Sequence, residues 1–315
     1  MVRIGTWNLE NLFRPGGEAG PTTNAAYTAK LDALATTITD LAPDVLAVQE
    51  VGDTDALQDL ADRLDGYDHH ATAAPDRRGI RVGFVSRLPL RNPREVAAFP
   101  DRLRPIQVDD TPVSAAEMGR AALIAEVDAD GHTLTLITCH LKSKLLTFPG
   151  GRFSTRDEGE RARFAAYALY RRAAEAVTVR AAATELLAGQ GQQRAVIVLG
   201  DLNDVPEAAT TQILHGPPGS EIGTGGFAQP DQGDGQRLWN FAARITPAEE
   251  RYSRIYRGRR ELIDHILASH RITRDVADGD VTAGPAGPSV GDNPEARRDQ
   301  PGSDHRPLVA AINLT

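Results

Sequence analysis

The sequence feature that most constrains the fold is Ala195–Pro206, which reads A-V-I-V-L-G-D-L-N-D-V-P. It opens with five apolar residues, a run too short for a buried helix and typical of a strand that is buried on both faces. The run stops at Gly200, and Asp201, Asn203 and Asp204 follow at once. These residues fit a turn with local side chain–backbone hydrogen bonds. They also fit a set of oxygen ligands at the end of a core strand, and this stretch alone leaves both interpretations open.

Other predicted strands end in polar side chains as well. We expect these strands at residues 3–8, 44–50, 82–86, 121–128, 132–140, 261–268 and 308–312. The polar residues at or beside their ends are Asn8, Glu10, Glu50, His140, Asp304 and His305. Carboxylates and amides are hard oxygen ligands, which Mg²⁺ and Mn²⁺ prefer more than zinc does. Because a buried carboxylate is costly unless it is paired or bound to a metal, these strand ends together predict a divalent cation.

Helical spacing appears between these strands. Leu31, Leu34 and Ile38 recur at the period of a helix, and Pro43 marks its end. Residues 157–188 are rich in Ala, Glu and Arg and predict one or two long helices. No repeat of about 20–50 residues and no break in composition divides the chain. We therefore expect an α/β architecture in a single domain over residues 1–315.

The composition is that of a soluble globular protein, with 41% hydrophobic and 25% charged residues. Lys and Arg total 35 against 43 Asp and Glu, for a net charge of −8. This balance argues against a protein held on nucleic acid by a broad positive field, while a locally basic groove stays open. Cys139 is the only cysteine, which excludes an intramolecular disulfide and a cysteine-rich zinc site.

The chain shows no sign of a membrane or secretory segment. No apolar run approaches the ~20 residues that a membrane span needs. The N-terminus has no basic region followed by an apolar one. We therefore expect a cytoplasmic monomer with no membrane contact and no protein partner.

Six motifs occur along the chain: T-W-N-L-E-N-L at 6–12, L-A-V-Q-E at 46–50, T-C-H-L-K-S-K at 138–144, L-G-D-L-N-D at 199–204, L-I-D-H-I at 262–266 and S-D-H-R-P at 303–307. Together they resemble the endonuclease/exonuclease/phosphatase superfamily, which has a deoxyribonuclease I-like fold, and they occur in that family's order. The resemblance implies a four-layer α/β/β/α sandwich of two mixed β-sheets flanked by helices, with the site at one rim.

The resemblance also implies a Mg²⁺ or Mn²⁺ cofactor and the residues that bind it. Glu50 is expected as the main metal-binding carboxylate, with Asn8 and Asp304 beside it, directly or through water. Glu10 completes the predicted metal set, although the apurinic-site repair branch of the family has an aspartate at this position.

The same resemblance implies the catalytic roles. Asp201 and Asn203 are expected to position the attacking water and a non-bridging phosphate oxygen. His305, oriented by Asp264, is expected to contact the phosphate and assist proton transfer. His140 is expected as a second histidine on the scissile phosphate, where the repair branch has a tyrosine.

Further basic residues are candidates for substrate binding. Lys142 and Lys144 share one strand parity and, with Asn8, are predicted to contact the substrate; a solvated edge is the alternative for the two lysines. The segments 77–81 and 251–260 are rich in arginine, but the sequence does not show where they lie relative to the site.

We therefore predict a divalent-metal-dependent phosphoester hydrolase that works by in-line attack of activated water. Its expected partner is a short nucleic acid or a small phosphorylated molecule. Glu50 is followed by Val51-Gly52, so the arginine found near this position in pancreatic-type nucleases is missing. Its absence favours the small phosphorylated substrate. The alternatives are a dedicated nuclease acting on DNA or RNA and a non-catalytic phosphate-binding module. A sphingomyelinase-like membrane enzyme has no exposed aromatic hairpin or secretory signal to support it.

Overall fold

Alternation along the core strands sorts the apolar side chains into separate layers. In β10 (Ala195–Asp201), Ile197 and Leu199 point into a core between two sheets. Val196 and Val198 point the other way, into a second core beneath a long helix. The strand is therefore buried on both faces, as its apolar run predicts. The computed structural model describes residues 1–111, 114–229, 232–293 and 295–314.

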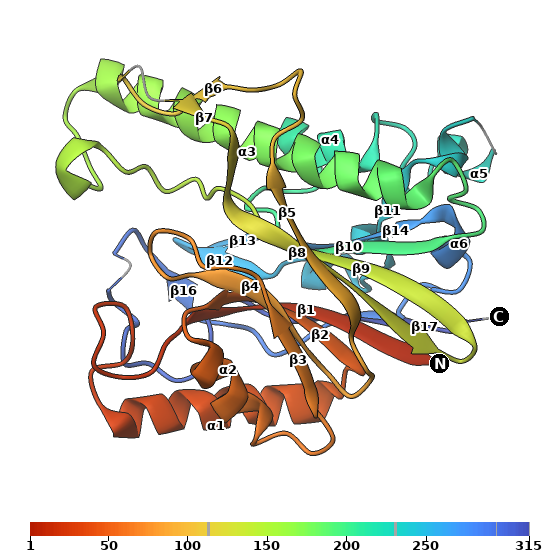
Figure 1. The fold of residues 1–315 in the computed structure, drawn as a ribbon, viewed down its shortest axis with the longest axis horizontal. Coiled ribbons are helices and arrows are strands. Elements are labelled where there is room, and N and C mark those ends of the chain that lie inside the picture. Colours follow the sequence, from red (N-terminus) through yellow and green to blue (C-terminus); the bar gives the residue numbers. More distant parts are fainter. Residues whose placement is uncertain (112–113, 230–231, 294, 315) are drawn as a thin grey trace.

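Two mixed sheets lie face to face (Figure 1). The first has the strand order β15 (Val281–Ala283), β17 (Leu308–Ile312), β1 (Val2–Leu12), β2 (Val45–Val51), β4 (Arg81–Ser86) and β3 (His69–Thr72). The second has the order β11 (Leu238–Asn240), β14 (Asp264–Ser269), β10, β9 (His132–His140), β8 (Glu117–Ala129) and β5 (Arg91–Ala98). The pairs β1–β2 and β9–β10 are parallel, whereas β14 runs antiparallel to β10.

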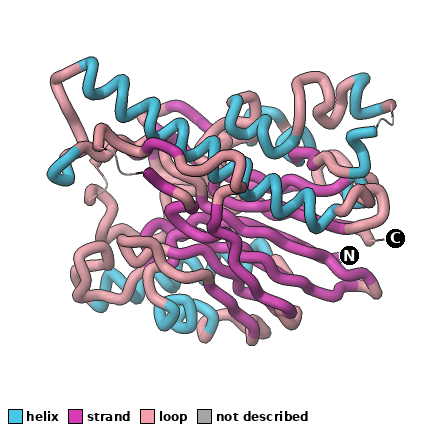
Figure 2. The backbone as a smooth tube through the Cα atoms, turned by 45° about the horizontal axis from the view of Figure 1, so that its top comes forward, coloured by secondary structure: helices cyan, strands magenta, loops and turns pink. Residues whose placement is uncertain are grey.

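Helices cover the outer face of each sheet, so the strands form the two inner layers (Figure 2). Helices α1 (Asn24–Leu41) and α2 (Thr54–Ala61) pack on the first sheet through a core that includes Leu34. Helix α3 (Glu158–Leu187) covers the second sheet with Val179 and its neighbours. The layers are thus α/β/β/α, which confirms the predicted fold class.

Shorter elements complete the described chain. They are α4 (Ala209–His215), α5 (Gly225–Ala228), α6 (His270–Thr273), 3₁₀ turns at Pro149–Gly151, Gln232–Gly235, Phe241–Arg244 and Ala248–Glu250, and the strands β6 (Ile106–Gln107), β7 (Ser114–Ala115), β12 (Arg254–Tyr256), β13 (Arg259–Glu261) and β16 (Ser289–Val290). β12 pairs with β13 and β16 to form a small separate sheet. Across the described ranges, no helix combines the length and the apolar character that crossing a membrane requires.

One predicted strand is divided in the structure. The sequence predicts a continuous strand over 261–268, whereas β13 ends at Glu261 and β14 begins at Asp264. The break arises because the backbone N–H groups of Ile263 and Asp264 donate to Ser253 Oγ, at 3.1 and 3.0 Å, and not to a neighbouring strand. The sequence places Asp264 in the middle of a strand, whereas in the structure it is the first residue of β14, on the rim of the sheet.

Candidate active site

The pleat of the core strands brings polar side chains from both sheets together at one rim. Side chains two residues apart in a strand point to the same side. Asp201 therefore shares the direction of Ile197 and Leu199, into the space between the sheets. The same parity with inward-facing apolar residues applies to Asn8 on β1, His140 on β9 and Asp264 on β14.

The register of the second sheet sets three of these residues side by side. Asp201 lies opposite His140 on β9 and opposite Asp264 on β14. Gly200 precedes Asp201 with a φ of 144°, and a Cβ there would lie 2.0 Å from the carbonyl oxygen of Cys139. Only glycine lets the two parallel strands pair at this point.

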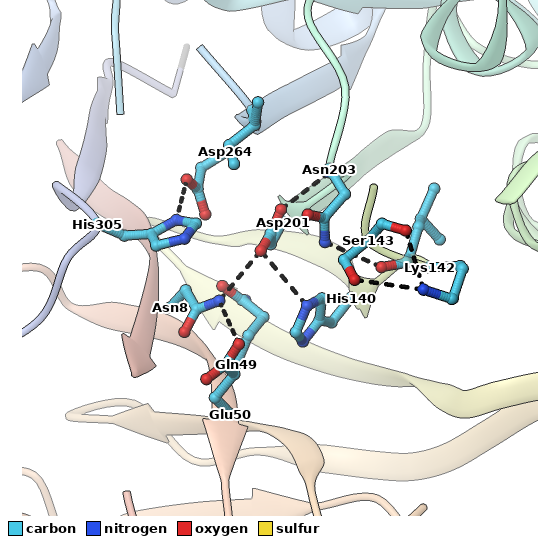
Figure 3. Close-up of polar contacts among 12 residues, drawn as sticks. Asn8, Gln49, Glu50, His140, Lys142, Ser143, Asp201, Asn203, Asp264 and His305 are labelled. Carbon is cyan, nitrogen blue, oxygen red and sulfur yellow. Dashed lines mark hydrogen bonds and ion pairs between the residues drawn. The ribbon is translucent and has the colours of Figure 1, made fainter. Parts of the chain in front are cut away.

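Hydrogen bonds join the two sheets across the site (Figure 3). Asn8 Nδ2 donates to Asp201 Oδ2 (3.0 Å) and to Glu50 Oε1 (3.2 Å). Beneath them, Gln49 Nε2 donates to Thr138 Oγ1 on the facing sheet (3.1 Å). These links fix Asn8 and Glu50 of the first sheet against Asp201 of the second. Sequence reasoning did not single out Gln49, although it lies inside the L-A-V-Q-E motif.

Asp201 is buried and held from several sides. Its Oδ1 accepts from the backbone N–H of Asn203 (2.9 Å), and its Oδ2 lies 3.4 Å from His140 Nε2. Burial and the negative charge of Asp264 raise the pKa of Asp201 to about 7. Burial and the nearby cation Arg120 lower the pKa of His140 well below its usual value, so this imidazole is neutral. A carboxyl group with a pKa near neutrality is suited to accept a proton from water.

His305 and Asp264 form a buried pair. His305 Nδ1 donates to Asp264 Oδ2 at 2.6 Å. Burial opposes protonation of the imidazole, yet the charges of Asp264 and Asp304 raise the pKa of His305 to about 10. His305 is therefore an imidazolium at neutral pH. Its other nitrogen, Nε2, lies 4.0 Å from Asp304 Oδ1.

We expect Asp264→Asn to lower the pKa of His305 from about 10 towards its ordinary value of 6.5 or below. Asp264 and Asp304 are the two main charges that stabilise the buried imidazolium. Without the Asp264 charge, only Asp304 of these two offsets the cost of burying it. NMR titration of the imidazole in the metal-free protein measures this directly. In the wild type, the raised pKa stabilises the fold fully below pH 6.5, and this contribution is lost as the pH rises through about 10. An unchanged pKa in the variant would contradict the assignment of Asp264 as the partner that holds the charge.

The carboxylate oxygens at this rim fit a hard divalent cation as ligands. Asp201 and Asp264 bring two buried carboxylates within 4.8 Å of each other, beside the His305 imidazolium that Asp264 already pairs with. Asp264 Oδ1 is buried and has no hydrogen-bond partner among the described residues. Glu50 adds a carboxylate from the facing sheet, and Asp304 adds one from the loop before β17. A set dominated by carboxylate oxygens is the chemistry of Mg²⁺ or Mn²⁺ sites.

Glu10 has a partner that the sequence did not indicate. Both of its oxygens accept from Arg297 Nε, at 2.8 and 3.0 Å. Burial and the charge of Asp304 raise the pKa of Glu10 to about 7. Lys30, a buried residue of α1, donates to the carbonyl of Gly302 in the same loop (2.7 Å). That Glu10 binds metal stays a prediction, and its ion pair with Arg297 competes with that role.

The two basic segments each bring an arginine close to the site. Arg254 of β12 places its Nε 3.3 Å from Asp304 Oδ2, with 27% of its side chain exposed. Arg78 lies near enough to His140 for its charge to contribute to the lowered pKa of that residue. The density of arginine in these segments was the available signal, but it does not tell which arginine faces the site.

The two predicted substrate-binding lysines differ in their contacts. Lys142 Nζ donates to the backbone carbonyls of Ser143 (3.0 Å) and Leu145 (2.8 Å), so it stabilises the loop after β9. Lys144 pairs with Asp204 at 3.0 Å, and 49% of its side chain is exposed. Substrate binding by either lysine stays a prediction, and the contacts favour Lys144.

Comparisons with known proteins agree with this fold and with the motifs. The model of the Endonuclease/Exonuclease/phosphatase family matches residues 5–305, which confirms the resemblance found in the sequence. No curated protein matches the chain.

Several solved structures are similar over nearly the whole chain. Truncated TDP2 from Caenorhabditis elegans has a TM-score of 0.57 at 16% identity, covering 99% of this chain and 97% of that chain. TDP2 from D. rerio, complexed with a single-strand DNA product, has a TM-score of 0.55 at 17% identity, covering 98% and 97%. A variant of the 3′ phosphatase NExo from Neisseria, bound to a product DNA hairpin, has a TM-score of 0.54 at 18% identity, covering 99% of both chains. At these identities the likeness shows the fold.

Proposed function

The chain belongs to the endonuclease/exonuclease/phosphatase family, and from this premise we propose that it is a divalent-metal-dependent phosphodiesterase. The observation that carries the proposal is the environment of Asp201. This buried carboxylate is fixed by Asn8 and Asn203 and faces one neutral and one cationic histidine. Such an arrangement supports hydrolysis of a phosphoester by water.

Asp201 is the proposed base. Its pKa of about 7 lets it orient a water molecule and take a proton from it at neutral pH. The hydrogen bonds from Asn8 and from the backbone of Asn203 set the direction of both carboxylate oxygens before a substrate arrives. That preorganisation favours in-line attack on phosphorus.

Asn203, His140 and His305 are proposed to hold the phosphoryl oxygens. The His305 imidazolium supplies positive charge, and its pKa of about 10 keeps that charge at neutral pH. The Asn203 amide is oriented by donation to the carbonyl of Leu141 (3.0 Å). Groups fixed in this way stabilise charge that develops in the transition state without having to reorganise.

Glu50, Asn8 and Asp304 are proposed to hold Mg²⁺ or Mn²⁺. When bound, the cation polarises the phosphoryl group and offsets negative charge on the leaving oxygen. Glu50 is aligned for this role because Oε1 accepts from Asn8 and Oε2 accepts from the backbone N–H of Asn11 (2.9 Å).

The proposed substrate is a phosphodiester in a short nucleic acid or a small molecule. The DNA products held by D. rerio TDP2 and by NExo support a nucleic acid. The net charge of −8 argues against a long duplex held on a broad positive surface. Arg78 and Arg254 offer local contacts instead. Action as a monomer in the cytoplasm is part of the same proposal.

The test is a panel of substrates with the purified protein: single- and double-stranded oligonucleotides, cyclic dinucleotides, phosphomonoesters and bis(p-nitrophenyl) phosphate, each with Mg²⁺ and with Mn²⁺. We expect turnover of diesters, with short or single-stranded ones preferred over duplex. Oligonucleotide binding without hydrolysis of any ester would support the alternative of a non-catalytic module. Preference for long duplex would support a dedicated nuclease.

A further inference from the structure

The hairpin of β12 and β13 reaches the active site through Arg254, and the proposed chemistry gives the residues beyond Arg254 no role. Residues 251–260 contain five arginines and no acidic residue, in a chain whose net charge is −8. Arg254 at the start of the hairpin forms a β-bridge with His305. This strongly basic segment is therefore attached to a catalytic motif.

Several contacts hold the hairpin rigidly against that motif. Ser253 Oγ accepts from the backbone N–H of Asp264 (3.0 Å), and the Ser253 carbonyl accepts from that of Arg306 (2.6 Å). The guanidinium carbons of Arg306 and Arg260 lie over the ring of Tyr252, 4.1 and 4.4 Å from its centre. Cation–π contacts of this kind stabilise the base of the hairpin. The hairpin thus has a fixed position relative to Asp264.

The strand register places one row of side chains on the face towards the site. Arg254 pairs with Glu261, and Tyr256 pairs with Arg259. Directly opposed residues, and residues two apart in a strand, lie on the same face. Arg254, Tyr256 and Arg259 therefore share a face with Glu261, whereas Arg260 is on the other face.

Arg254 forms the inner end of this row. Its Nε lies 3.3 Å from Asp304 Oδ2. The charges of Asp304, Asp201 and Glu50 all act on its guanidinium. A cation this close to the proposed base and metal ligands is within reach of the scissile phosphate.

Tyr256 and Arg259 form the outer end, about 7 Å farther along the strand. Arg259 is exposed, and its side chain has no hydrogen-bond or ion-pair partner in the described part of the chain. Arg257, at the turn, is instead paired with Asp292, which also accepts from the Tyr256 hydroxyl. The exposed Arg259 is thus free to bind an anion, while Arg257 is already paired with Asp292.

We propose that this face binds single-stranded nucleic acid on one side of the scissile phosphate. Arg254 contacts the scissile phosphate, Tyr256 stacks on the adjacent base, and Arg259 contacts the next phosphate. Tyr256 is half-buried, and the guanidinium carbons of Arg254 and Arg257 lie 5.8 and 5.7 Å from the centre of its ring. An aromatic ring among cations is an arrangement that binds successive bases and phosphates of a single strand. This inference rests on the proposed function, because it takes the site of Asp201 as the place where the strand is cut.

Binding of an about ten-nucleotide fluorescent single strand to the metal-free full chain tests the proposal, by anisotropy over a salt series. Arg259→Gln should weaken binding and make the slope of log affinity against log salt shallower by about 0.7, the value of one single-strand phosphate contact. Arg257→Gln is the matched control, with the same charge change in the same turn, and should alter affinity less than about twofold.

Two substitutions of Tyr256 separate stacking from charge. Tyr256→Leu should raise Kd at least about fivefold, the loss of one stacking contact, and leave the salt slope unchanged. Tyr256→Phe keeps the ring and should bind as the wild type does. Turnover of bis(p-nitrophenyl) phosphate should be unchanged in Arg259→Gln and Tyr256→Leu, because that substrate does not extend along the hairpin.

Equal effects of Arg257→Gln and Arg259→Gln would overturn the proposal, since the arginines would then act only through overall charge. Unchanged binding in Tyr256→Leu would also overturn it. Because binding is measured without metal, a protein that shows the expected pattern but hydrolyses no ester would refute the proposed function and leave the hairpin site standing. Diester turnover with unaffected strand binding in every variant would refute the hairpin site alone.

Discussion

Asp201→Asn should lower kcat by about 10²–10⁴-fold, the usual cost of losing a positioned group that transfers a proton. Asparagine keeps the size of the side chain and one acceptor oxygen, but it cannot take a proton from water. We expect KM to change much less, because the substrate's ground state does not depend on that proton. Single-turnover rates with the preferred diester, at saturating metal, measure the effect.

The companion variant Asp264→Asn should lose less activity, about 10–10²-fold, because Asp264 acts through His305 and not on the water. Equal or reversed losses, in variants shown to be folded, would mean that the two aspartates have the opposite roles. The comparison is well matched, since both carboxylates are buried and lie opposite each other in the β10–β14 register.

The free energy of unfolding of Asp201→Asn shows whether the variant is folded, and its pH dependence tests the raised pKa of Asp201. The folded-state pKa of Asp201 is about 7 against an ordinary value of 3.8, so ionisation of this group destabilises the fold as the pH rises from 3.8 to about 7. The variant lacks that group. In the metal-free protein, its free energy of unfolding should therefore fall less than that of the wild type over this range.

Removal of the divalent metal should abolish turnover, and Glu50→Gln should reproduce much of that loss. Glutamine keeps the acceptor for Asn8 but loses the negative charge that the cation needs. We expect the variant to bind Mg²⁺ or Mn²⁺ at least about 10–100-fold more weakly, a loss that even an outer-shell partner can cause. Calorimetric titration of metal into chelator-treated protein measures this affinity apart from activity. Undiminished hydrolysis after exhaustive chelation would refute the metal-dependent mechanism.

The same metal titration of Glu10→Gln tests whether Glu10 is a metal ligand. The sequence places Glu10 among the metal ligands, whereas both of its oxygens accept from Arg297 in the structure. We expect a smaller loss of metal affinity than in Glu50→Gln. An equal loss would support the original prediction and imply that metal binding breaks the ion pair with Arg297.

Much of the site could be predicted because its residues follow local rules. An apolar run that stops at a polar residue places that residue at the end of a buried strand, as at Glu50 and Asp201. The period of two then gives the direction of the side chain, so that His140 points inward with Leu136 and Leu134, the apolar residues four and six positions before it. The family motifs added the α/β/β/α arrangement of two mixed sheets, which the structure confirms.

Contacts between distant segments could not be predicted in this way. The strand expected at 261–268 is divided because Ser253 accepts the N–H of Asp264, and nothing in the apolar pattern indicates that hydrogen bond. The pairing of Arg254 with Asp304 depends in the same way on how a hairpin lies against a loop.

The sequence by itself therefore determined the strands, their polar ends and the chemistry that those ends offer, because hydrophobic periodicity and turn residues act over a few neighbours. Only the tertiary structure decided two of the partners: Arg297 for Glu10 and Arg254 for Asp304. The physical reason is that electrostatic and hydrogen-bond energies depend on distances in space. Glu10 and Arg297 are 287 positions apart in the chain, and only the packing of the two sheets and their rim loops brings them into contact.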